Sequence, residues 1–223
     1  MQRAQGVLGI EHRWLGYEDS GLPENGEALA PNAFASIPVE ISAEPLVRLV
    51  REYRPHVIVS YDENGGYPHP DHIRAHQVAM RAWEAAADSA SYPDAGDPWV
   101  AGKFYYDRIF NADRVRAVHE AMLAERPADP LTAEMARMVE WTAERGSDAT
   151  THIRCDAFFD VRDEALRSHA SQVAPTSAFF FWPNDVQRDA WPYEDYVLAH
   201  SRVETTLPET DLFAGITDEE DAG

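Results

Sequence analysis

A helix followed at once by a short, wholly apolar, β-branched run constrains the fold of this chain more than any other feature. Residues 42–53 place leucine and valine at helical spacing behind Ser42, which predicts a helix with Ser42 as its N-cap. Residues 57–61, with the sequence VIVSY, predict a central strand buried on both faces. A helix and then a strand is typical of a parallel α/β layer. The loop after residue 61 is therefore expected at the sheet edge where open α/β folds bind ligands.

The rest of the chain continues with helices and strands of ordinary length. Apolar spacing with start and stop residues predicts a helix capped by Asn111, one capped by Thr132 that runs to residue 145, and helices over residues 1–8, 70–87 and 162–172. Strands are predicted over residues 11–17, 103–107, 151–155 and 193–203. We expect one α/β domain over residues 1–204 and an acidic tail over residues 205–223, of which residues 212–216 dock back onto the domain. No start signal precedes residues 1–8, so an earlier segment is also expected.

The charge and the cysteine count limit the partners of the protein. A formal charge of −20, from 39 acidic and 19 basic side chains, repels a phosphate backbone and argues against nucleic acid as a partner. The same charge is typical of a soluble, salt-adapted surface. Cys155 has no second cysteine to pair with, and no apolar run approaches the roughly 20 residues that cross a bilayer. The opening residues do not form a signal peptide, so we expect a cytoplasmic protein that acts on small molecules and binds no membrane, with its oligomeric state left open.

The chemistry-bearing stretch is YPHPDH, residues 67–72, directly behind the glycines of the predicted loop. If Pro70 is the first helical residue, His69 is the cap and His72 lies in the first turn, so both imidazoles can face the cavity above the strand. Imidazole is a good ligand for zinc, which would acidify a water for attack on an amide. His69 or Asp71 could move a proton, and Tyr67 could donate to the developing oxyanion.

Other interpretations of these residues stay open. Histidines at a helix start also serve as caps or surface residues, and His76 is better explained as a residue behind the site or on the surface. An iron oxygenase that uses His69, His72 and a remote carboxylate is an alternative. The aromatic run over residues 178–183 is interpreted as core rather than as a substrate platform.

The stretch YDENGGYPHPDHI, residues 61–73, resembles the second signature of the LmbE-like (PIG-L) deacetylases. The resemblance continues through three further stretches: WLGYEDSGLP over residues 14–23, ALRSHASQ over residues 165–172 and PETDLFAGI over residues 208–216. The residues of the signature and of the C-terminal stretch are most similar to those of the family members that are conjugate amidases. These landmarks span nearly the whole chain.

The resemblance implies a Rossmann-like fold with a mostly parallel sheet flanked by helices, and zinc-dependent hydrolysis of an amide on a glucosamine linked to inositol. In the conjugate amidases, this amide joins the sugar to an S-substituted N-acetylcysteine, so the substrate is a sugar-thiol conjugate and the reaction detoxifies electrophiles. His72 resembles the zinc ligand of the second motif, and Tyr67 the oxyanion donor. His69 resembles the histidine that assists the leaving group or the transition state, and Asp71 the residue that orients it.

The chain also departs from the family pattern. Members begin with a strand leading to AHPDDE, which supplies the other two zinc ligands and the general base, and no such stretch occurs here. His12 is no substitute, because its surroundings match a later part of the family. We therefore expect that the first strands are missing, that this chain alone binds zinc weakly, and that it turns over substrate negligibly. The alternatives are the sister deacetylase, which removes acetate from a glucosaminyl inositol, and a non-catalytic remnant that binds a sugar or a partner.

Overall fold

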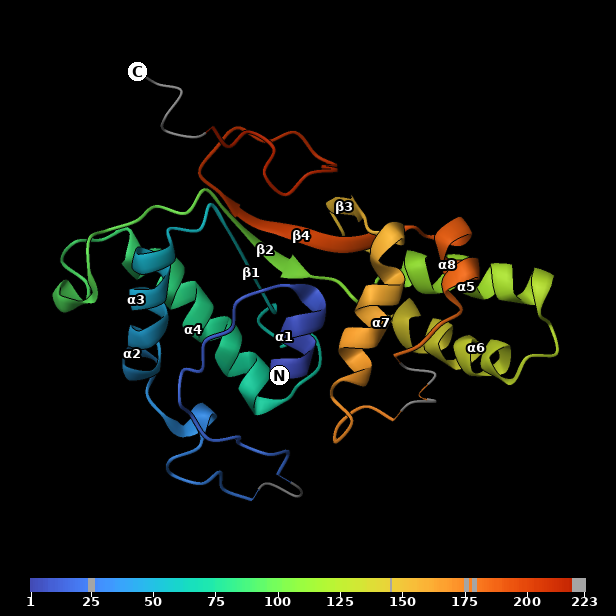
Figure 1. Cartoon of the computed structure of the whole chain (residues 1–223), viewed down its shortest axis with the longest axis horizontal. Coiled ribbons are helices and arrows are strands. Elements are labelled where there is room, and N and C mark those ends of the chain that lie inside the picture. Colours follow the sequence, from blue (N-terminus) through green and yellow to red (C-terminus); the bar gives the residue numbers. More distant parts are fainter. Residues whose placement is uncertain (24–26, 145, 175–176, 178–179, 218–223) are drawn as a thin grey trace. The chain divides into compact units, whose positions relative to one another are not determined.

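The computed structural model describes residues 1–23, 27–144, 146–174, 177 and 180–217. These residues form two compact units, shown by sequence colour in Figure 1. The first unit joins Met1–Arg13 to Ile109–Asp195, and the second joins Trp14–Arg108 to Tyr196–Gly223. Each unit therefore contains segments that are distant in the sequence.

The second unit is built on two parallel strands covered by helices. Strand β1 (Val57–Ser60) pairs in parallel with β2 (Lys103–Asp107), with Val57 opposite Lys103 and Ser60 opposite Tyr106. Helix α3 (Glu44–Tyr53) packs along α4 (Pro70–Ala86), and α2 (Val39–Ser42) also contacts α4. Two short 3-10 turns, η1 (Phe34–Ser36) and η2 (Pro93–Ala95), lie against these helices. Apolar residues of α3 and of the last turns of α4 form the core. The start of α4 lies beside the end of β1, where His76 contacts the Tyr61 carbonyl oxygen.

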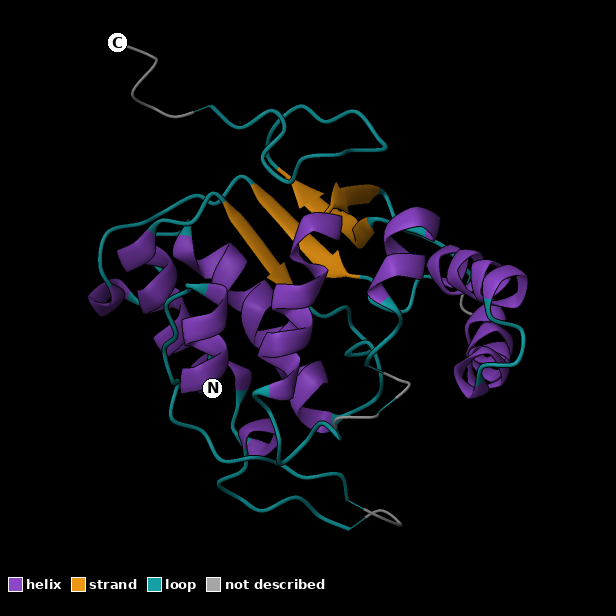
Figure 2. Ribbon diagram, turned by 45° about the vertical axis from the view of Figure 1, so that its right-hand side comes forward, coloured by secondary structure: helices purple, strands orange, loops and turns teal. Residues whose placement is uncertain are grey.

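The sheet is mixed rather than mostly parallel. Strand β4 (Tyr193–Ser201) runs antiparallel to β2, and the order of the described strands is β1-β2-β4-β3, drawn in orange in Figure 2. The α/β architecture with flanking helices is thus confirmed. The prediction that β1 is central and buried on both faces is wrong, because β1 lies at one edge of the described sheet and Val59 is 45% exposed.

The first unit is mainly helical. Helix α5 (Ala112–Glu125) packs against α6 (Pro130–Ala143) and α8 (Asn184–Ala190), and α1 (Gln2–Leu8) packs against α7 (Phe159–Arg167). Strand β3 (Thr151–Arg154) and the turn η3 (Asp156–Phe158) precede α7. The core includes Trp182, as the interpretation of the aromatic run predicts, whereas residues 178 and 179 of that run lie outside the described residues.

Several predicted boundaries are confirmed and others are corrected. Asn111 caps α5 through its side chain, and Gly9 closes α1 at a φ of 66°. Ser42 ends the short helix α2 instead of capping α3, and Thr132 lies inside α6, whose cap is Asp129. Residues 11–17 form no strand, and the helix predicted over residues 162–172 begins earlier and ends at residue 167.

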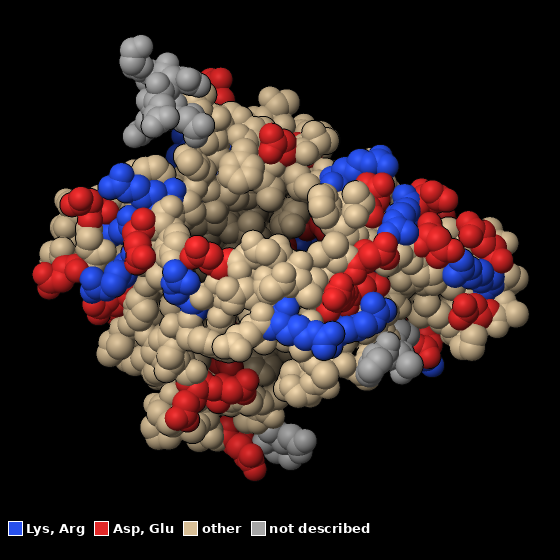
Figure 3. All heavy atoms as spheres, viewed as in Figure 1, with Lys and Arg blue, Asp and Glu red and all other residues tan. Residues whose placement is uncertain are grey.

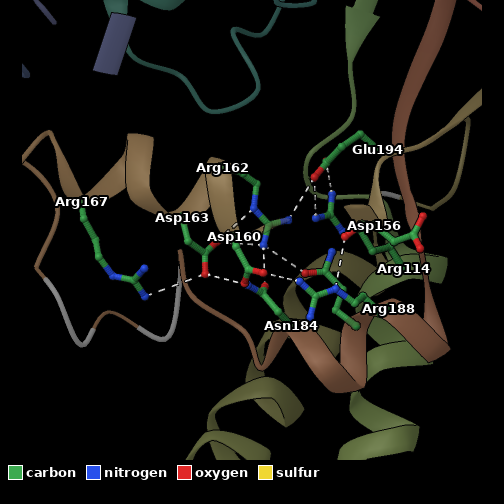
Figure 4. A network of polar contacts seen from close by, with 10 residues as sticks. Arg114, Asp156, Asp160, Arg162, Asp163, Arg167, Asn184, Arg188 and Glu194 are labelled. Atoms are coloured by element: carbon green, nitrogen blue, oxygen red, sulfur yellow. Dashed lines mark hydrogen bonds and ion pairs between the residues drawn. The ribbon is translucent and has the colours of Figure 1, made fainter. Parts of the chain in front are cut away.

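A network of arginines and carboxylates ties the helices of the first unit together (Figure 4). The Arg162 guanidinium donates to Glu194 at 3.1 Å, to Asn184 at 3.2 Å and to Asp163 at 3.0 Å. Arg114 donates twice to the same Glu194 carboxylate, at 2.7 and 3.3 Å. Because these guanidinium groups are paired with acidic side chains within the unit, the cluster stabilises the fold and does not present an anion-binding site.

The C-terminal segment of the second unit is fixed to β2 by a buried ion pair. The Lys103 ammonium and the Tyr105 hydroxyl both donate to the Glu209 carboxylate, the second at 2.7 Å. A side chain at Gly102 would meet Ile216 at 3.3 Å, which shows how closely this segment packs on the strand. The residues after 204 are therefore docked at least as far as Ile216.

Charged side chains of both signs lie side by side on the face shown in Figure 3. On the helices of the second unit, Glu40 pairs with Arg81 at 2.9 Å and Glu44 pairs with Arg48 at 3.3 Å. Some of the acidic side chains on these helices are thus paired with arginines. None of the described helices has the length and the apolar character to cross a membrane.

Candidate functional site

The loop between β1 and α4 is shaped by one carboxylate. One oxygen of Asp62 accepts from the backbone amides of Asn64 and Gly66, each at 3.0 Å, and the other accepts from Arg108 at 3.0 Å. Gly65 and Gly66 have φ angles of 71° and 72°, which favour glycine. The loop is therefore held in one sharp bend that brings its backbone back toward α4.

Gly65 is the point of closest approach between this loop and α4. A Cβ atom at this position would lie 2.7 Å from the Cβ of His72, so no larger residue fits without displacement. The Gly65 carbonyl oxygen lies 3.0 Å from Nδ1 of His72. The predicted glycine loop thus positions the imidazole directly, through its main chain.

The start of α4 follows the prediction. Pro70 is the first helical residue and His69 is the N-cap, whose Nδ1 accepts the backbone N–H of Asp71 at 3.1 Å. An imidazole nitrogen that accepts a hydrogen bond carries no proton, so the neutral His69 ring holds its proton on Nε2. His69 therefore presents a hydrogen-bond donor.

His72 has the opposite tautomer. A carbonyl oxygen can only accept, so Nδ1 of His72 carries the proton that it donates to Gly65, and in the neutral ring the lone pair lies on Nε2. A carbonyl partner on one imidazole nitrogen is the arrangement that orients the other nitrogen as a metal ligand. His72 thus presents a ligand atom, and the centres of the His69 and His72 rings are 5.3 Å apart.

Tyr67 lies beside both imidazoles. Its ring centre is 4.7 Å from that of His72 and 5.9 Å from that of His69, and the residue is 42% exposed. The structure therefore brings together the three rings that the sequence assigned to chemistry. The hydroxyl faces no hydrogen-bond partner among the described residues, which leaves it able to donate to a ligand.

Asp71 contacts the site differently from the prediction. One carboxylate oxygen accepts the backbone N–H of Ser20 at 3.0 Å, and the other is buried without a hydrogen-bond partner among the described residues. His69 is held by the backbone amide of Asp71 and not by its carboxylate. The orienting role of Asp71 stays a prediction, and its observed contact ties the loop of residues 14–23 to α4.

Two contributors were missed by the sequence analysis. No sequence pattern identifies Ser20, because its backbone N–H and not its side chain makes the contact with the Asp71 carboxylate. Tyr61 was counted only as the end of a strand, yet its ring stacks on His72 at 4.2 Å with an interplanar angle of 9°. His76 donates from Nδ1 to the Tyr61 carbonyl oxygen at 3.0 Å, which agrees with its interpretation as a residue behind the site.

The expectation that the protein binds zinc can be compared with the metal-binding side chains that the structure describes. Within the described part of the chain, no group of three or more histidine, cysteine, aspartate or glutamate side chains could hold a metal. The lone pair on Nε2 of His72 is suitable, but a catalytic zinc needs three protein ligands. The residues that the structure describes therefore supply one oriented ligand and not a complete zinc site.

Comparison with known proteins gives a consistent picture. Residues 1–83, which include the site, match the family described as PIG-L: GlcNAc-PI de-N-acetylase. The chain is 45% identical over 223 residues to the mycothiol S-conjugate amidase of Streptomyces coelicolor, covering 98% of this chain and 75% of that protein. It is 38% identical to the 1D-myo-inositol 2-acetamido-2-deoxy-alpha-D-glucopyranoside deacetylase of Streptomyces scabiei, covering 94% and 67%. The corresponding deacetylase of Thermobifida fusca is also 38% identical, covering 96% and 76%.

Proposed function

This chain belongs to the PIG-L, or GlcNAc-PI de-N-acetylase, family of hydrolytic enzymes, and from that premise we propose that it is an amidohydrolase of the mycothiol S-conjugate amidase type. Its substrate would be the amide between an S-substituted N-acetylcysteine and glucosaminyl inositol. The observation that carries the proposal is the 45% identity to such an amidase over 98% of the chain, against 34–38% for the deacetylases found.

The geometry supports an amide substrate through its hydrogen-bond donors. The Nε2–H of His69 and the hydroxyl of Tyr67 are two donors beside one ligand atom, Nε2 of His72. In amide hydrolysis, negative charge develops on the carbonyl oxygen, and fixed donors stabilise that charge. We assign this stabilisation to Tyr67 and His69, and the leaving amine could take its proton from the same edge of the site.

Zinc is the metal that we propose for His72, because neutral imidazole is a good zinc ligand and bound zinc acidifies water. The described residues supply only this ligand, so zinc binding by the chain is expected to be weak and turnover slow. A cytoplasmic location also remains part of the proposal, as does a small sugar-thiol conjugate as the partner. The exclusion of nucleic acid stays a prediction from the charge.

A substrate comparison tests the proposed reaction. The purified chain, with excess zinc, is incubated with a mycothiol S-conjugate or with N-acetylglucosaminyl inositol, and the released amine is quantified. We expect faster release from the conjugate. Equal or reversed preference would rule out the amidase assignment in favour of the deacetylase.

A second candidate is a non-catalytic protein that binds the sugar conjugate. It is favoured by one observation, the lack of a complete set of metal ligands among the described residues. The same experiment separates the two functions when binding is measured by calorimetry alongside amine release. Binding of the conjugate without release above a zinc blank would support the second candidate and contradict the first.

The roles proposed for Tyr67 and His72 predict different effects of their substitution on turnover and on zinc affinity. Tyr67→Phe removes one donor to the oxyanion and should lower turnover by roughly a hundredfold, the low end for such donors because this tyrosine is partly exposed. Its zinc affinity should not change, whereas His72→Ala should reduce zinc affinity and turnover together. Calorimetry with zinc and steady-state kinetics measure the two effects. Loss of zinc binding in the Tyr67 variant would contradict its assigned role.

A further inference from the structure

Two short segments of the second unit lie side by side, although they are distant in the sequence. The Ser20 hydroxyl oxygen accepts the backbone N–H of Ala35 at 2.9 Å. The Glu18 carbonyl oxygen accepts the backbone N–H of Phe34, also at 2.9 Å. Ser20 and Ala35 are therefore direct neighbours, and they form a small polar surface that a helix can contact.

Two side chains of α4 end at this surface. Asp71 and Arg74 are three residues apart, so they lie on the same face of the helix. One carboxylate oxygen of Asp71 accepts the backbone N–H of Ser20 at 3.0 Å. The Nη2 group of Arg74 donates to the carbonyl oxygen of Ala35 at 2.6 Å. The helix and these hydrogen bonds thus close a ring around the space between the two side chains.

Each of the two side chains also has a buried polar atom that the ring leaves unused. These atoms are the second carboxylate oxygen of Asp71, Oδ1, and the Nε of Arg74. Neither has a hydrogen-bond partner in the part of the chain that the structure describes, so the two atoms do not bond to each other. A buried polar group of a charged side chain is costly without a partner, and a third group is therefore expected between them.

The two unused atoms determine the chemistry of this third group. It must donate a hydrogen bond to Oδ1 of Asp71 and accept one from Nε of Arg74, as a water molecule or a hydroxyl group does. An anion would be repelled by the carboxylate, and a cation by the guanidinium. Both atoms are closed to solvent, so a hydroxyl on a large ligand reaches them only if the ring opens, whereas a single water molecule can be enclosed.

We propose that one water molecule is bound between Oδ1 of Asp71 and Nε of Arg74. Through this water, Arg74 holds the Asp71 carboxylate in the position in which it accepts from Ser20. The water therefore completes the attachment of the Ser20 segment to the first turns of α4. This inference goes beyond the proposed hydrolysis and does not depend on it.

The test detects the water at the Arg74 guanidinium. The purified chain is prepared with isotope-labelled arginine, and the Nε–H signal of Arg74 is identified by its absence from the NMR spectrum of Arg74→Lys. We expect a nuclear Overhauser effect between this proton and water, with the sign of a water that stays bound for longer than the protein takes to tumble. In a crystal structure, an ordered oxygen should lie within about 3.2 Å of both Oδ1 of Asp71 and Nε of Arg74.

Arg74→Lys removes the contact with the water and keeps the positive charge, because a methylene group takes the place of Nε. The Asp71 carboxylate loses its bridge, so hydrogen exchange of the Ser20 amide should become roughly 2–10-fold faster, as for the loss of one hydrogen bond. Arg48→Lys makes the same change at a half-exposed position of α3 and should leave this exchange unchanged. The amide of Val47, in the core, detects any general loss of stability.

Four results would overturn the proposal. They are a resolved Arg74 signal without an effect from water, a direct contact between Asp71 Oδ1 and Arg74 Nε in the crystal, and equal acceleration of exchange at Ser20 and Val47 in Arg74→Lys. The fourth is loss of the water signal when myo-inositol is added, which would show that a ligand hydroxyl occupies the site. The crystal structure needs no variant, so it decides the question even if Arg74→Lys fails to fold.

Discussion

Glu209→Ala is expected to lower the free energy of unfolding by about 3–5 kcal/mol, since it leaves a buried ammonium group without its carboxylate. The Lys103 side chain is 0% exposed and the Glu209 side chain 2%, so water cannot replace the lost partner. Tyr105 also donates to Glu209 and would lose this acceptor. Urea unfolding followed by circular dichroism measures the change.

Two control proteins test whether the lost stability comes from the buried ion pair. Glu204→Ala removes the same charge from an exposed position of the same segment and should change stability by no more than about 0.5 kcal/mol. The double variant Lys103→Met with Glu209→Leu removes both charges, and most of the lost stability should return because buried ion pairs and apolar residues are often equivalent. A Glu209→Ala protein as stable as the Glu204→Ala protein would contradict the buried pair.

Gly65→Ala is expected to lower any turnover by at least about a hundredfold, because displacement of a catalytic group by about 1 Å has this effect. The new Cβ atom would lie 2.7 Å from the Cβ of His72, and the φ angle of 71° adds strain of about 1–2 kcal/mol for a residue with a side chain. Zinc titration and the tautomer of His72 report the displacement independently of turnover.

Gly66→Ala is a matched control for this prediction. Gly66 has nearly the same φ angle, 72°, but a Cβ atom there would meet only Tyr61, at an ordinary 3.7 Å. The two variants should therefore lose similar stability from backbone strain, and only Gly65→Ala should displace His72. Equal effects on zinc binding in the two variants would show that strain, and not the close contact, governs the site.

The parts of the site that are local in sequence could be predicted well. Pro70 at the first position of a helix, with His69 as its cap, follows from residue preferences within one turn, and the structure has both. The loop before them was expected from the sequence, and its two glycines have the positive φ angles that this residue favours. These features are determined by residues that are close together in the chain, so they can be predicted from a short stretch of sequence.

The parts that depend on distant segments could not be predicted in the same way. The Asp71 carboxylate accepts from Ser20, 51 residues earlier in the chain, and no local pattern identifies that partner. The exposed edge position of β1 depends on which strands pair with it, and an apolar run alone cannot show this. Ser42 is a good capping residue, but the preceding residues form a short helix of their own that uses it as an end.

The two imidazoles of the site take their proton positions from peptide groups. His69 faces the amide of Asp71, and His72 faces the carbonyl of Gly65, so the neutral His69 ring presents an N–H donor and the neutral His72 ring presents a lone pair. Peptide groups do not ionise in the physiological range, unlike the carboxylates that often hold such rings. The tautomers of the two histidines are therefore set by main-chain groups, and neutralising a nearby acidic side chain would leave these tautomers unchanged.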